Sequence, residues 1–177
     1  CIRDRVYSMQ IINCTIADIP MMLNLYDAAR EYQKEKSNRH WQSFDPAMIK
    51  IEIEERRQWK IVDNGTIVCI FLTVYDDPFI WGDRNNDPSV YIHRIVTHPN
   101  HRGNNYTSKI IDWAKEHGRR LDKHFIRMDT WGDNPKLIEY YVKCGFTFLE
   151  IITPDTTGGL PDYYSCISLS LFEIKID

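Results

Sequence analysis

The chain has 177 residues, of which 43% are hydrophobic and 27% are charged, so it can bury a sizeable core and is long enough for one ordinary domain. Its formal net charge is −3, which argues against a dedicated nucleic-acid-binding protein, because such proteins neutralise phosphates with a basic face. It contains no apolar run near the ~20 residues of a membrane-spanning helix, and it starts without the apolar core of a secretory signal.

The five cysteines are an odd count without paired spacing, and Cys69 lies inside an apolar run, as a buried free thiol would. Free thiols are typical of a reducing compartment. Residues 1–177 are therefore predicted to form a single cytoplasmic domain that binds neither a membrane nor a nucleic acid.

The first half of the chain opens with a strand and two helices. Met9–Cys14 is a short predicted strand, and apolar residues then recur at helical spacing from Ile19 to Ala29, with Thr15 as the N-cap. Asp45 followed by Pro46 predicts the start of the second helix, because a capping carboxylate and a proline in the first turn are both favoured there.

A β-hairpin and a loop follow. The pair Asn64-Gly65 separates two apolar runs, Trp59–Asp63 and Thr66–Tyr75, and Asn-Gly readily takes the positive φ of a two-residue turn. The segment 76–89 is rich in Asp, Asn and Pro, which predicts an exposed loop.

The second half alternates strands and helices. In chain order, the predicted elements are a strand Tyr91–Thr97, a helix to about Leu121, a strand Phe125–Thr130, a helix Asn134–Lys143 ending at Gly145, and two closing strands, Phe146–Ile152 and Tyr164–Ile174. This order predicts an α/β fold with one mixed sheet.

The segment Arg102–Asn105, rich in Gly and Asn, joins a strand to a helix. Such a loop can point several backbone N–H groups into one concavity, and the helix dipole adds positive potential, which together suit a phosphate. The same residue types also form bare turns before helices, so on this segment alone both interpretations stay open.

A second segment makes the pattern more specific. Val96–Gly103 is similar to the fourth strand and the start of the R-x-x-G-x-G/A pyrophosphate loop of the GNAT superfamily of N-acetyltransferases. Asn134–Phe146 resembles that family's N-x-x-A-x-x-Y-Y-x-x-x-G-F signature. Two departures stand in the loop: Asn105 replaces a Gly, which Asn's tolerance of left-handed backbone accommodates, and Thr107 replaces a Gly or Ala, where its hydroxyl could donate to a phosphate or crowd it.

The resemblance implies a GNAT fold: a single mixed and largely antiparallel sheet with helices on both faces and splayed central strands. It also implies acetyl transfer from acetyl-CoA to a primary amine by direct attack in a ternary complex. In that scheme Tyr141 donates a proton to the departing thiolate. The coenzyme-binding residues that it implies are Ile95, Val96, Thr97, Arg102, Gly103, Asn104, Asn105, Tyr106, Thr107, Asn134 and Tyr141.

Two catalytic candidates follow, each with a structural alternative. An amine attacks only when neutral, and a lysine-like amine with a pKa of ~10.4 needs ~4–5 kcal/mol to lose its proton at pH 7. His93, which alternates with Tyr91 and Ile95 on one strand face, stands where the family often has a Glu and could act as the base, directly or through water. A strand His can equally be structural, and Tyr141 could be an aromatic core residue.

The remaining predictions concern the residues that contact the acceptor amine, metal binding, and functions other than acetyl transfer. The aromatic and acidic candidates for contacts with a cationic amine are Glu31, Tyr32, Glu35, Trp41, Phe44, Trp131, Tyr163 and Tyr164. The loop that carries Asp76, Asp77, Asp83 and Asp87 is also acidic and would suit such an amine. An ordinary solvated surface explains them equally well.

His93, His98 and His101 lack ligand spacing, so no metal is expected. The partner is a small-molecule or peptide amine, and a monomer and a homodimer are both compatible with the sequence. The alternatives are a non-catalytic acyl-CoA-binding or regulatory module, or an interaction protein of the same fold.

Overall fold

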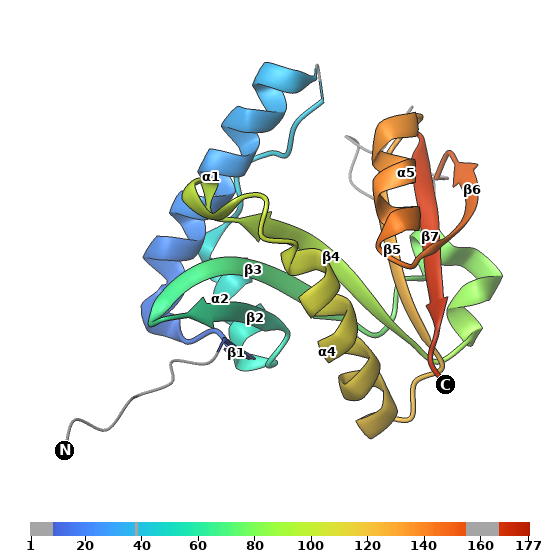
Figure 1. Cartoon of the computed structure of the whole chain (residues 1–177), viewed down its shortest axis with the longest axis horizontal. Coiled ribbons are helices and arrows are strands. Elements are labelled where there is room, and N and C mark those ends of the chain that lie inside the picture. Colours follow the sequence, from blue (N-terminus) through green and yellow to red (C-terminus); the bar gives the residue numbers. More distant parts are fainter. Residues whose placement is uncertain (1–8, 38, 155–166) are drawn as a thin grey trace. The chain divides into compact units, whose positions relative to one another are not determined.

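A computed structural model describes residues 9–37, 39–154 and 167–177 (Figure 1). Its strands are β1 (Gln10–Asn13), β2 (Gln58–Asp63), β3 (Thr66–Val74), β4 (Ser89–Thr97), β5 (Phe125–Trp131), β6 (Thr147–Ile152) and β7 (Leu169–Lys175). Its α-helices are α1 (Ile19–Lys36), α2 (Pro46–Glu54), α3 (Pro78–Trp81), α4 (Tyr106–Arg120) and α5 (Pro135–Lys143), and its 3-10 turns are Ile16–Asp18, Gly82–Asn86 and Pro99–His101.

The strands form one sheet in the order β1-β2-β3-β4-β5-β7-β6. β4 and β5 pair in parallel, whereas β1 with β2, β2 with β3, β5 with β7 and β6 with β7 are antiparallel. The predicted mixed, largely antiparallel sheet is confirmed. Within the described ranges, none of the helices is long and apolar enough to cross a membrane.

The chain divides into two compact units, which are described in turn. Unit 1 comprises Cys1–Thr73 and Arg94–Tyr106, and unit 2 comprises Val74–His93 and Thr107–Asp177. The prediction of a single domain over residues 1–177 stays a prediction.

The core of unit 1 lies between two helices and the sheet. Met22, Leu25 and Tyr26 of α1 and Ile49 and Ile53 of α2 are buried in one cluster with side chains of β3 and β4. The predicted Asp45 cap and the Asn64-Gly65 turn are confirmed here, whereas Thr15 caps the 3-10 turn Ile16–Asp18 and the N-cap of α1 is Asp18. The carboxylate of Asp45 accepts a hydrogen bond from the N–H of Ala47 (2.9 Å), and the hairpin turn has φ values of 48° at Asn64 and 78° at Gly65.

In unit 2, helices cover both faces of the β5–β7–β6 part of the sheet. Leu169 and Leu171 of β7 pack in a cluster with Ile80 and Trp81 of α3, whereas Phe172 contacts the rings of Tyr141 in α5 and of Phe146 just after it. Neighbouring residues of a strand point to opposite faces, so α3 and α5 lie on opposite sides of β7. Figure 1 shows α5 (orange) along β5 and β7.

The structure corrects one predicted loop. Residues 76–89 were expected to be exposed, but they contain α3 and a 3-10 turn, and Ile80 and Trp81 are 8% and 3% exposed. The prediction failed because the segment is mostly polar and Pro-rich, so its two buried apolar residues, Ile80 and Trp81, gave little signal.

The predicted last strand, Tyr164–Ile174, begins at Leu169 in the structure, and Tyr163 and Tyr164 lie outside the described residues. Cys69 is buried as a free thiol, as predicted, whereas Cys144 is only partly buried.

Candidate functional site

Strand β4 carries an irregularity at Arg94, next to the candidate base. Arg94 has a φ of 50°, in the left-handed region, so the predicted alternation of Tyr91, His93 and Ile95 does not run unbroken. A left-handed residue inside a strand is the geometry of a β-bulge and needs support from its surroundings. The guanidinium of Arg94 pairs with the carboxylate of Glu52, which also accepts a hydrogen bond from Gln58 (2.7 Å), and these contacts hold the bulge in unit 1.

After the bulge, the side chain of Val96 in β4 packs into the core of unit 1. Val96 is 4% exposed in that core, whereas Ile95 and Thr97 are only partly buried. Because Val96 faces the core, its side chain is a packing residue, and a ligand along this strand would meet its backbone. The strand ends at Thr97, and the N–H of the next residue, His98, donates to the carbonyl of Val68 (2.8 Å).

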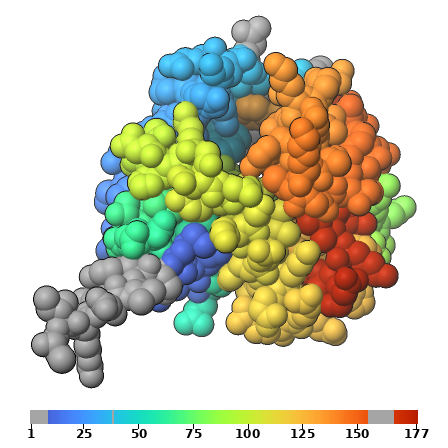
Figure 2. Space-filling view, viewed as in Figure 1, coloured from blue at the N-terminus to red at the C-terminus, as the bar shows by residue number. Residues whose placement is uncertain are grey.

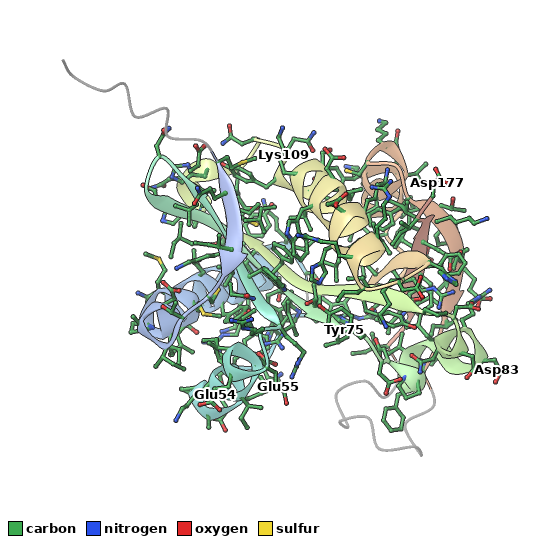
Figure 3. The ribbon with its side chains drawn as sticks, turned by 90° about the horizontal axis from the view of Figure 1, so that it is seen from below. Glu54, Glu55, Tyr75, Asp83, Lys109 and Asp177 are labelled. Atoms are coloured by element: carbon green, nitrogen blue, oxygen red, sulfur yellow. The ribbon has the colours of Figure 1, made fainter. Side chains whose placement is uncertain are left out.

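The loop between β4 and α4 has the backbone geometry that the phosphate-site hypothesis needs. Gly103 and Asn105 have φ values of 85° and 54°, so Asn105 takes the left-handed conformation predicted for it. The first turn of α4, Tyr106–Lys109, is described in full and carries no acidic side chain (Lys109 is labelled in Figure 3). The amino end of this 15-residue helix therefore presents N–H groups and positive potential without a competing carboxylate.

The structure brings two candidate residues of unit 1 together. The guanidinium of Arg102 lies over the ring of Tyr32, 4.2 Å from its centroid, and Figure 2 shows α1 (light blue) and the loop segment (yellow-green) adjoining on the surface. Glu31 pairs with Lys34 at 2.8 Å on the exposed side of α1. Trp41 and Phe44 pack with Tyr26 in an aromatic cluster, so their burial is explained by the core.

In unit 2, Thr107 of α4 is hydrogen-bonded to Tyr140 of α5. The hydroxyl of Tyr140 donates to Oγ1 of Thr107 (3.1 Å), and Thr107 is 8% exposed. Because Thr107 accepts this hydrogen bond, its own hydroxyl hydrogen can still donate to another acceptor. Asn134 caps α5 by accepting a hydrogen bond from the N–H of Leu137 at 3.2 Å.

Tyr141 sits in an aromatic cluster. Its ring contacts Phe146 and Phe172 with centroid distances of 6.1 and 5.3 Å. Burial of the hydroxyl, followed by the influence of Tyr140 and Cys144, raises the pKa of Tyr141 well above the ordinary value of a phenol. The phenol therefore keeps its proton across the neutral and mildly alkaline range. Its role as a proton donor stays a prediction.

His93 lies between two carboxylates of unit 2. Its Nε2 is 3.2 Å from Oδ2 of Asp77, just before α3, and its Nδ1 is 3.8 Å from Oδ1 of Asp129 in β5. One atom that could bind a metal ion, a ring nitrogen of His93 or a carboxylate oxygen of each aspartate, lies within 4.8 Å of the other two. Burial is the main reason that the pKa of Asp129 is raised to about 6. The negative charge of Asp77 raises it further, whereas His93 lowers it.

Sequence reasoning missed Asp129, although the strand register contains the signal. Tyr91 of β4 is paired with Arg127 of β5 in parallel, and advancing both strands by two residues leads to His93 and Asp129. Finding this pair required knowing that β4 and β5 are neighbours, and neither strand alone encodes that. The rings of His98 and His101 meet edge to face in unit 1, with centroids 5.3 Å apart, while His93 belongs to unit 2. Trp131 packs against the cluster that contains Leu169 and Leu171.

The raised pKa of Asp129 predicts a pH-dependent stability. Relative to the ordinary value of 3.8, a folded-state pKa of about 6 means that the folded protein binds this proton more tightly than the unfolded chain. The resulting stabilisation is complete below about pH 4 and is lost as the pH rises through about 6, with a size of about 3 kcal/mol.

Urea unfolding of the wild type and Asp129→Asn at pH 4, 5, 6 and 7 measures this effect. The variant is expected to gain about 3 kcal/mol relative to the wild type between pH 4 and pH 7, because it cannot ionise at this position. A difference between the two proteins that stays constant over this range would contradict the expectation.

Known proteins share this sequence pattern and fold. The model of the Acetyltransferase (GNAT) family matches residues 21–146. The uncharacterized N-acetyltransferase YesJ of Bacillus subtilis (strain 168) is 27% identical over 73 residues, which span 41% of this chain and 41% of that protein. A GNAT-family acetyltransferase structure from Listeria monocytogenes has a TM-score of 0.74 at 20% identity and covers 94% of both chains. The structure of yncA from Salmonella typhimurium with its cofactor acetyl-CoA has a TM-score of 0.67 at 18% identity, covering 96% of this chain and 94% of that one. Because the family match extends over more than half of the sequence, this chain belongs to the acetyltransferase (GNAT) family.

Proposed function

We propose that this protein transfers the acetyl group of acetyl-CoA to a primary amine, on a small molecule or a peptide, by direct attack in a ternary complex. The loop Arg102–Asn105 carries the proposal. Its left-handed residues Gly103 and Asn105 lead into the amino end of α4, whose first turn holds Lys109. Backbone N–H groups at such a helix start favour a diphosphate, and membership of the GNAT family supports acetyl-CoA as the molecule that supplies it.

Each coenzyme contact is assigned to a segment. The backbone of residues 95–97 would pair with the pantetheine arm as an added strand would, and Asn134 would contact the same arm. The amides of residues 102–107 would hold the diphosphate. Thr107 could add a hydrogen bond to a diphosphate oxygen while it accepts one from Tyr140.

The chemistry needs a base and an acid. His93 would take a proton from the ammonium group of the acceptor, so that the neutral nitrogen attacks the thioester carbonyl. Tyr141 would give its proton to the thiolate sulfur as the C–S bond breaks. The raised pKa of Tyr141 supports this assignment, since an acid must be protonated when the leaving group departs. Glu31, Tyr32 and Trp131 are proposed to contact the acceptor.

Acetyl-CoA binding is tested by thermal unfolding. Ligand at ~100 times its Kd adds about 2.7 kcal/mol of stability, which raises Tm by about 5–10 °C for a chain of this size. Gly103→Val is expected to weaken binding at least tenfold, because a β-branched residue resists a φ of 85°. A Cβ at Gly103 would meet no described atom within 4 Å, so the loss would report on backbone conformation.

The matched control is Gly65→Val in the hairpin turn, where φ is 78° and a Cβ would likewise meet no described atom within 4 Å, and this variant is expected to bind acetyl-CoA as well as the wild type. Thiol release is then followed with 1,4-diaminobutane, an aminoglycoside and a short peptide with a free N-terminus. No Tm shift at millimolar acetyl-CoA would favour an interaction protein. A shift without thiol release by any of these amines would favour the non-catalytic acyl-CoA-binding module.

A further inference from the structure

An aromatic side chain of α1 contacts the first residue of the loop Arg102–Asn105, within unit 1. The guanidinium of Arg102 lies 4.2 Å from the centroid of the Tyr32 ring, and Nζ of Lys36, one helical turn after Tyr32, lies 5.7 Å from the same centroid. The electron-rich face of an aromatic ring attracts cations, so both contacts are favourable. Tyr32 is 43% exposed, so burial in the core does not account for the position of its ring.

Helix α1 provides a firm support for this contact. Leu25 and Tyr26 are buried in the core of unit 1 on the inner side of the helix. One residue after Tyr32, the side-chain oxygen of Gln33 accepts a hydrogen bond from the N–H of Trp41 (2.8 Å), which fastens the end of the helix to the segment that follows it. A side chain that packs on Tyr32 is therefore held by the body of unit 1.

The loop gains from such a support. The side-chain N–H of Asn104 donates to the carbonyl of His101 (2.8 Å), so this hydrogen bond shapes the segment from within. The contact of Arg102 with Tyr32 instead joins the first residue of the loop to a separate element. A loop that already has its binding conformation loses less conformational entropy when its amides bind a ligand, and it binds that ligand more tightly.

The charges near Tyr32 favour an anion. Lys34 is paired with Glu31 of the same helix at 2.8 Å. In the part of the chain that the structure describes, no carboxylate pairs with Lys36 or with Arg102. Two cations on one ring repel each other, and an anion nearby offsets that repulsion. Uncompensated positive charge thus lies beside the loop whose amides are proposed to hold the diphosphate.

We propose that Tyr32 is a positioning residue for coenzyme binding. Its ring holds the guanidinium of Arg102, and through it the start of the loop Arg102–Asn105, in the conformation that binds the diphosphate. The inference rests on the proposed acetyltransferase function and extends the coenzyme site to a helix residue that acts through Arg102. A contact of Tyr32 with the acceptor would change KM for the amine, whereas the positioning role changes the Kd for acetyl-CoA when no amine is present.

The contact can be observed by NMR without any ligand. The ring current of Tyr32 shields groups above its face, so the δ-methylene protons of Arg102 should resonate upfield of their ordinary position. This shift should persist in Tyr32→Phe, which keeps the ring, and vanish in Tyr32→Ala. An unshifted Arg102 side chain in the wild type would refute the contact on which the proposal depends.

Calorimetric titration with acetyl-CoA in the absence of amine measures the positioning effect. Tyr32→Ala is expected to raise Kd by about three- to tenfold, whereas Tyr32→Phe should bind within about twofold of the wild type because phenylalanine also attracts a cation. Met21→Ala is the matched control: it removes a large side chain of the same helix that is similarly exposed, at 40%, and should bind acetyl-CoA as the wild type does.

A double-mutant cycle tests whether Tyr32 acts through Arg102. In Arg102→Ala there is no guanidinium to hold, so adding Tyr32→Ala should raise Kd by less than about twofold more. The full loss in that background, an equal loss in Tyr32→Phe, or wild-type affinity in Tyr32→Ala would each overturn the proposal while leaving the proposed function intact. A wild type that does not bind acetyl-CoA would refute the proposed function itself.

Discussion

Replacing Tyr141 with phenylalanine is expected to lower kcat by about 100-fold or more while leaving the Kd for acetyl-CoA nearly unchanged. A positioned acid typically contributes 10²–10⁴-fold to a rate, and a phenylalanine keeps the ring contacts with Phe146 and Phe172 while removing the proton. Single-turnover thiol release measures the chemical step, and the Tm shift with acetyl-CoA measures binding.

Tyr140→Phe is the matched control for this substitution. Tyr140 is the adjacent residue of α5, is 43% exposed and donates to Thr107, so its loss removes one hydrogen bond near the proposed diphosphate site. It is expected to weaken acetyl-CoA binding by up to tenfold and to change kcat by only a few-fold. If Tyr141→Phe kept the wild-type rate in single turnover, the acid would have to be sought elsewhere.

The second large effect concerns stability, and it arises at the bulge of β4. Glu52→Leu is expected to lower the free energy of unfolding by about 3–5 kcal/mol, because it leaves the guanidinium of Arg94 buried without its carboxylate. Glu52 and Arg94 have side-chain exposures of 6% and 15%, so water cannot easily replace the lost partner. For a chain of this length the change corresponds to a fall in Tm of roughly 6–20 °C.

Glu54→Leu is the control in the same helix. Glu54 is 59% exposed and pairs only loosely with Lys50, at 3.8 Å (Figure 3). Its replacement should change the free energy of unfolding by less than about 0.5 kcal/mol. Adding Arg94→Met to Glu52→Leu should recover part of the loss, since it removes the uncompensated charge. Equal small effects of Glu52→Leu and Glu54→Leu in urea unfolding would show that the buried pair does not support the bulge.

Local signals in the sequence predicted most of the fold and the loop. The Asn64-Gly65 turn, the Asp45 cap and the left-handed backbone of Asn105 depend on neighbouring residues and on the conformational freedom of each residue type, so they can be read from a short segment. The family signature then predicted how such segments combine into one mixed sheet.

What the sequence did not reveal depends on contacts between distant segments. Glu52 and Arg94 are far apart in the chain, and nothing in either segment indicates that they form a buried pair. Arg127 stands in the predicted strand Phe125–Thr130, and only the structure shows that its side chain is 1% exposed and paired with Asp87 and Glu173. Asp129 is the same kind of case, because its meaning depends on the strand that lies beside it. Charged residues in predicted strands are therefore the positions where sequence reasoning is weakest.

The most direct test of this account is a crystal structure of the protein with acetyl-CoA. The account predicts that the diphosphate accepts hydrogen bonds from main-chain N–H groups of residues 102–107, with Gly103 and Asn105 still left-handed, and that the thioester sulfur lies within reach of the Tyr141 hydroxyl. A diphosphate bound away from those amides, or a Tyr141 hydroxyl directed away from the sulfur, would contradict it.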